Sequence, residues 1–157
     1  MPENVALLRL RRTLLIHRIV QVALCVLLVY MALHFQQLFH AKGMPQVFRN
    51  SLLATLLLQV VLFFPLRRFA DNEARRELAV VAAGSDADRH KQLRQQRLIG
   101  DTLKGAVFLG FATFIIIAPP ATFVLSTAFF CFIVTVVTYL QCFNFSVRRG
   151  LADQPPA

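Results

Sequence analysis

The chain has 157 residues, of which 57% are hydrophobic and only 16% are charged, and its formal net charge is +9. Soluble domains are closer to a quarter charged, so this composition argues against a water-soluble protein. The apolar residues also gather in long runs without any charge, and helices of that kind offer no polar face to water. We therefore predict one all-α unit, residues 1–157, that is integral to a membrane.

Membrane topology explains the surplus of basic residues better than nucleic-acid binding does. The cytoplasmic flanks of membrane helices collect Lys and Arg. Such flanks also meet the anionic head groups of lipids. We therefore expect a lipid bilayer as the surroundings of this chain, and we expect no nucleic-acid partner.

The first two apolar runs predict two membrane spans. The first span covers about residues 14–39 and follows a basic N-terminal stretch. Gly43 is a natural helix end and Pro45 a natural restart. The second span covers about residues 47–66, and Pro65 with the arginines after it marks the exit from the membrane.

A hydrophilic segment, about residues 67–103, separates the second span from the third. Gly84 suits the left-handed residue that ends a helix. Ser85 with Asp88 three residues later fits a capping box, with Asp in place of the usual Glu. The segment therefore predicts an antiparallel helical hairpin that stands off the membrane, and its second helix should run directly into the third span.

The longest uncharged run, residues 105–147, is more than twice as long as one span requires. Pro119 and Pro120 interrupt it. Proline lacks a backbone donor and disfavours helix in the residue before it. We therefore predict a third span over about 101–118 and a fourth over about 121–147, joined by a tight outer turn.

Charge supports this count of four spans. The N-terminus, the hairpin and the C-terminus then lie on one side and hold nearly all of the Lys and Arg, whereas the outer segments hold Lys42 and Arg49. Because basic residues concentrate on the cytoplasmic side, we predict a cytoplasmic (inner or plasma) membrane with both termini and the hairpin in the cytoplasm. A kinked third span that turns nearer Ser126 is the alternative, and it gives the same count.

No chemistry of a known active site is visible in the sequence. The apolar interiors of the spans contain no Asp or Glu, whereas proton-coupled transporters usually need a titratable group there. His17, His34 and His40 belong to one helix, so only a homodimer would assemble a bis-histidine haem site. Motifs for nucleophilic, phosphate or zinc chemistry are missing, and the cysteines lack metal-binding spacing. We expect no catalytic site, no metal and no cofactor, and hence no enzyme.

A seam of small residues runs along the fourth predicted span. Its members recur at spacings of three and four, which is typical of membrane helices that approach closely. We expect packing within one subunit, with a subunit interface as the alternative. The residues of this seam are Ala128, Cys131, Thr135, Thr138 and Cys142.

Three glutamines lie at matching depths in different spans. Gln21, Gln59 and Gln141 each fall about 10 Å inside the inner edge, at 1.5 Å per residue. An amide that faces hydrocarbon is costly, so each amide should seek a partner. We predict that at least two of the three face the bundle interior in one polar layer. The alternative is that each glutamine side chain bonds to the backbone of its own helix or extends to the membrane surface.

The hairpin has a basic face. We expect this face to contact an acidic partner or anionic lipid heads, with simple solvation as the alternative. The residues of the face are Arg89, Lys91, Arg94 and Arg97.

These observations favour a non-catalytic role. We predict an integral membrane subunit or scaffold that binds a larger membrane complex or itself, because active-site chemistry is missing beside a well-capped hairpin. The alternative is a small oligomeric channel or transporter. The Thr and Gln residues within the spans give that alternative its support.

Overall fold

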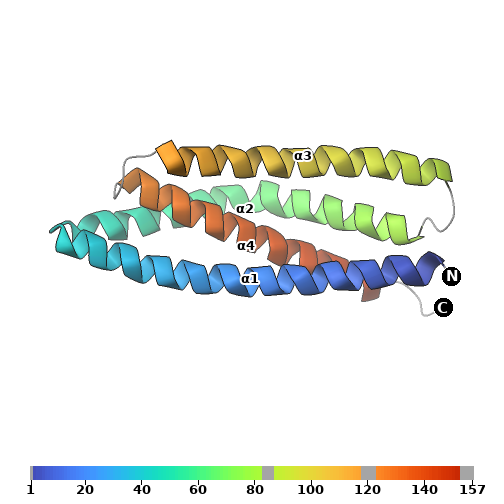
Figure 1. Cartoon of the computed structure of the whole chain (residues 1–157), viewed down its shortest axis with the longest axis horizontal. Coiled ribbons are helices and arrows are strands. Elements are labelled where there is room, and N and C mark those ends of the chain that lie inside the picture. Colours follow the sequence, from blue (N-terminus) through green and yellow to red (C-terminus); the bar gives the residue numbers. More distant parts are fainter. Residues whose placement is uncertain (1, 83–86, 118–122, 153–157) are drawn as a thin grey trace.

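A computed structural model describes residues 2–82, 87–117 and 123–152 of the chain. It contains four long helices, α1 (Pro2–Ala41), α2 (Pro45–Ala82), α3 (Ala87–Ile117) and α4 (Phe123–Ala152). The helices alternate in direction along one long axis, so that the start of α1, the end of α2, the start of α3 and the end of α4 share one end of the molecule (Figure 1).

Each helix contains a segment long and apolar enough to cross a bilayer. These segments are Leu10–Ala41, Pro45–Val80, Gly100–Ile117 and Phe123–Ala152. The prediction of an all-α chain with four potential spans is therefore confirmed. The orientation in a membrane and the cytoplasmic position of the hairpin stay predictions.

The break between α1 and α2 follows the local sequence. Gly43 has a positive φ of 69°, which glycine adopts without steric cost. The Gly43 amide donates to the carbonyl of His40 at 3.0 Å, and the Met44 amide donates to that of Phe39 at 2.9 Å. This pair of bonds is a Schellman motif, which satisfies carbonyls at the end of α1. Pro45 then begins α2, as the sequence predicts.

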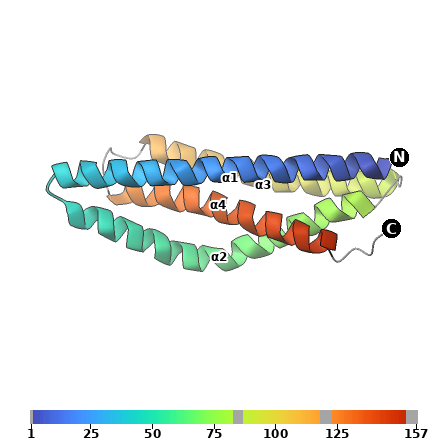
Figure 2. The ribbon, with the colours of Figure 1, turned by 90° about the horizontal axis from the view of Figure 1, so that it is seen from below.

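Helix α2 continues through Pro65 instead of ending there. Proline removes one backbone bond and crowds the preceding turn, so it bends a helix that is held at both ends. Figure 2 shows α2 bending near its middle. The segment 67–103, predicted as a hairpin, thus contains the last part of α2 and the first part of α3. Its tip, including Gly84 and Ser85, lies outside the described residues.

The prolines at 119 and 120 also lie outside the described residues. The chain nevertheless forms two separate helices on either side of them, because α3 ends at Ile117 and α4 begins at Phe123. Ser126 lies inside α4, one turn after its start. The alternative of a third span that turns nearer Ser126 therefore does not describe this structure.

Helices α2 and α4 form the central pair of the fold, with the most extensive contact in the molecule. Helix α1 packs against both of them, and α3 makes a smaller contact with both. Figure 1 shows α2 and α4 between α1 and α3. Within the described residues, the backbones of α1 and α3 do not come close to each other.

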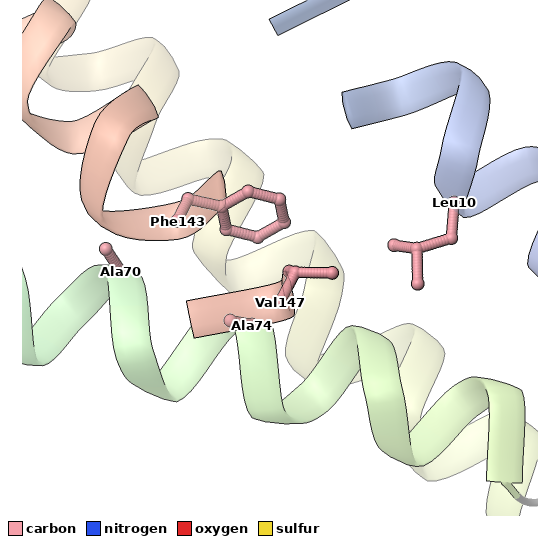
Figure 3. Close-up of a cluster of buried hydrophobic side chains, with 5 residues drawn as sticks. All are labelled: Leu10, Ala70, Ala74, Phe143 and Val147. Atoms are coloured by element: carbon pink, nitrogen blue, oxygen red, sulfur yellow. The ribbon is translucent and has the colours of Figure 1, made fainter. Parts of the chain in front are cut away.

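Small side chains allow the central pair to pack closely at the end that holds the termini. Ala70 and Ala74 of α2 are fully buried there against Phe143 and Val147 of α4. Figure 3 shows Phe143 and Val147 between these alanines and Leu10 of α1. This cluster joins three of the four helices.

Aromatic rings form the core at the other end. Phe35 and Phe39 of α1 and Phe130 of α4 are buried together. The rings of Phe35 and Phe130 meet edge to face with centroids 5.7 Å apart, an arrangement that aromatic pairs prefer. Helix α1 is therefore held to α4 at both ends.

Candidate functional site: polar contacts and a groove around helices α2 and α4

The predicted packing seam of α4 lies partly against α2. Cys131 is buried, and the other members of the seam are half-buried. Thr135 and Thr138 both hydrogen-bond to α2. The seam thus contributes to a contact within one chain.

Gln59 of α2 is the partner of these two threonines. Its Nε2 donates to Thr138 Oγ1 at 3.1 Å. Its Oε1 accepts from Thr135 Oγ1 at 3.2 Å. Both the donor and the acceptor group of the Gln59 amide are therefore hydrogen-bonded to α4. These bonds limit the free-energy cost of placing the amide among apolar side chains. One turn earlier, Thr55 Oγ1 donates to the carbonyl of its own helix at Ser51 at 2.8 Å.

The structure does not bring the other two predicted glutamines to this contact. Gln21 is half-buried on α1, and Gln141 is exposed on α4. Gln59 instead takes its partners from the predicted seam. A polar layer that contains at least two of the three glutamines therefore stays a prediction. The side chains of the predicted basic face, Arg89, Lys91, Arg94 and Arg97, lie outside the described part of the structure.

A charged cluster connects α2, α3 and α4. The carboxylate of Glu73 on α2 accepts from Lys104 Nζ on α3 and from the hydroxyl of Tyr139 on α4. Lys104 also donates to Asp101 at 3.3 Å, and its Nζ lies 5.5 Å from the centroid of the Tyr139 ring. The Glu73 side chain is only 15% exposed. We name Glu73, Lys104, Tyr139 and Asp101 the carboxylate cluster.

Sequence reasoning missed this cluster. Glu73 was expected in the hairpin, outside the spans, and Lys104 is the last charge before the uncharged run. The available signal was Lys104 itself, because a lysine at the start of an apolar helix needs an acidic partner or a position at the membrane surface. Nothing in the local sequence identifies Glu73 and Tyr139 as that partner.

His17 of α1 lies at the side of α4. Its ring meets that of Phe143 edge to face, with centroids 5.1 Å apart. Among the described residues, no three His, Cys, Asp or Glu side chains gather closely enough to hold a metal ion. His17 thus packs on α4, and its buried Nδ1 has no hydrogen-bond partner among the described residues.

A groove of about 720 Å³ lies between α2 and α4. Phe63 and Phe145 line it with apolar surface, and Ala74, Leu78 and Cys142 add small and aliphatic groups. The remaining lining is largely polar. The groove therefore combines an apolar surface with charged side chains.

Three arginines line the same groove. Arg67 and Arg75 come from α2 and Arg149 from α4, and all three are exposed. Asp71 is the acidic residue of the lining. Its carboxylate accepts from the hydroxyl of Ser146, and it lies 4.0 Å from the Arg67 guanidinium. The cationic groups of the groove thus outnumber its carboxylate.

No family, curated protein or solved structure matches this chain. The functional argument therefore rests on the chemistry and packing of the chain itself.

Proposed function

We propose that the chain is a non-catalytic integral membrane subunit or scaffold, and that helix α3 is the surface that packs against a partner protein or a second copy. The proposal places the chain in a cytoplasmic (inner or plasma) membrane, with both termini in the cytoplasm. The single observation that supports it is the small contact between the described part of α3 and the rest of the chain.

Among the side chains that the structure describes, two contacts attach α3 to its neighbours. One is the carboxylate cluster through Lys104. The other is the packing of Phe108 and Phe111 on Phe132 of α4, with centroids 5.6 and 5.1 Å apart. Beyond these, Leu109, Ile116 and Ile117 are 65%, 82% and 75% exposed.

Loose packing matters more in a membrane than in water. Lipid tails are as apolar as leucine, so apolar contact alone does not drive helices together. Close packing and interhelical hydrogen bonds must hold them. A helix that packs on its own chain over a small area suits a role in which another chain completes its contacts.

Size measurement in mild detergent tests the proposal, followed by mass spectrometry of co-purifying proteins. We expect a stable complex that is larger than the 17.7 kDa chain. Photo-crosslinkers at Leu109 and Ile116 should capture the partner, whereas crosslinkers at the exposed Val22 and Val29 of α1 should not. A lone monomer with no captured protein would refute the subunit reading.

A small oligomeric channel or transporter is the second candidate. It is favoured by the polar side chains that follow the α2–α4 contact from Thr55 through Gln59 to Glu73. Reconstitution into liposomes tests this function. Ion or solute flux that Glu73→Gln alters would support it, and absence of flux would count against it.

A further inference from the structure

The groove between α2 and α4 has the form of an amphipathic binding site. Phe63 precedes the bend of α2 and lies in the predicted second span, whereas Arg75 follows twelve residues later. At 1.5 Å per residue these positions are about 18 Å apart along the helix. The groove therefore extends from apolar helix surface to a cluster of charges. A molecule that fills it should itself be apolar at one end and charged at the other.

We propose that this groove binds one anionic phospholipid. The guanidinium groups of Arg67, Arg75 and Arg149 would bind its phosphate, since arginine matches phosphate oxygens in a bidentate geometry. An acyl chain would lie along Phe63 and Phe145. The inference rests on the proposed membrane location and extends it to a specific lipid site.

Charge complementarity favours an anion. Asp71 is the single carboxylate among the lining residues, and the Ser146 hydroxyl already donates to it. The arginines outnumber it three to one. An acidic peptide would satisfy the arginines but would leave the aromatic part of the groove without an apolar partner. A phospholipid satisfies both parts, and the bilayer supplies it at high local concentration.

The helices offer a matched control for each groove arginine. Each groove arginine has a second arginine directly beside it in the sequence. These neighbours, Arg68, Arg76 and Arg148, are also exposed but do not line the groove. The groove variant combines Arg67→Gln, Arg75→Gln and Arg149→Gln. The control variant combines Arg68→Gln, Arg76→Gln and Arg148→Gln. Both variants remove the same net charge from the same end of the molecule.

Native mass spectrometry of the full chain in detergent measures the bound lipid. The probes are phosphatidylglycerol, which is anionic, and phosphatidylcholine, which has no net charge. We expect wild type and the control variant to retain one phosphatidylglycerol in preference to phosphatidylcholine. The groove variant loses three charge-assisted contacts to the phosphate that the control variant keeps, so it should bind phosphatidylglycerol about 100-fold more weakly than the control variant does.

Equal loss of lipid from the groove and control variants would indicate diffuse electrostatic attraction and would overturn the proposal. Equal retention of lipid by the two variants would also overturn it. Glycerol phosphate and a short poly-glutamate peptide are competitors in the same experiment. We expect neither to displace the lipid, because neither fills the apolar part of the groove. Displacement of the lipid by glycerol phosphate would indicate a site for small anions. Displacement by the peptide would indicate a protein-docking site. Either result would overturn the proposal.

A second variant leaves every charge in place. Cys142→Phe inserts a ring among the lining groups of the groove and should expel the lipid, whereas Cys25→Phe, at an exposed position of α1, should not. Retention of phosphatidylglycerol by Cys142→Phe with unchanged helix content would contradict the proposal. Failure of the subunit reading is measured separately, by the partner capture described above.

Discussion

The hydroxyl of Tyr139 offers a direct test of the carboxylate cluster. Tyr139→Phe removes a single oxygen, which donates to Glu73 between α4 and α2. Hydrogen bonds to charged groups contribute about 1.5–3 kcal/mol in proteins, whereas interhelical bonds in membranes average about 0.6 kcal/mol. Because Glu73 is only 15% exposed but keeps Lys104 as a partner, we expect a loss of about 1.5 kcal/mol in the free energy of unfolding.

Titration with sodium dodecyl sulfate in mixed micelles, followed by far-ultraviolet circular dichroism, measures this loss. Tyr30→Phe is the matched control, because the Tyr30 side chain is 63% exposed and should change stability by less than about 0.5 kcal/mol. A double-mutant cycle with Glu73→Gln should give a coupling energy of about 1 kcal/mol. If Tyr139→Phe costs no more than Tyr30→Phe, the hydroxyl does not contribute to holding the helices together, and the reasoning fails.

Three further outcomes are expected. Phe130→Ala should lower the free energy of unfolding by about 3 kcal/mol, because it opens a cavity between α1 and α4. Phe64→Ala, at a residue that is 74% exposed, should change it little, and similar values for the two variants would contradict the assigned core. Gln59→Leu should cost about 1 kcal/mol, because its two threonine partners lose their bonds, and a gain in stability would argue against that contact. In a chain without native cysteines, Met44→Cys should react with an impermeant thiol reagent from outside intact cells and Arg149→Cys only after permeabilisation; the reverse pattern would invert the topology.

The sequence alone determined the helical class and the number of apolar helices. A span needs only a sufficient run of apolar residues, and each of the four runs is local in the chain. The local sequence also determines where α1 ends, because Gly43 adopts its positive φ without any distant contact. The separation of α3 from α4 followed from two consecutive prolines, whose effect on a helix is confined to their own turn.

Only the tertiary structure decided which side chains face one another. The local sequence at Pro65 is compatible both with the end of a helix and with a bend. In the structure α2 continues through Pro65 and packs on the rest of the chain on both sides of it. That continuity places Glu73 beside Lys104 and Tyr139, and it places Arg67 and Arg75 along one groove with Arg149. Periodicity gives the face of each helix but neither its rotation nor its crossing with the next. Contacts between residues 31 to 79 positions apart, such as Lys104 with Glu73 and Gln59 with Thr138, depend on those two quantities and are therefore fixed only when the helices pack.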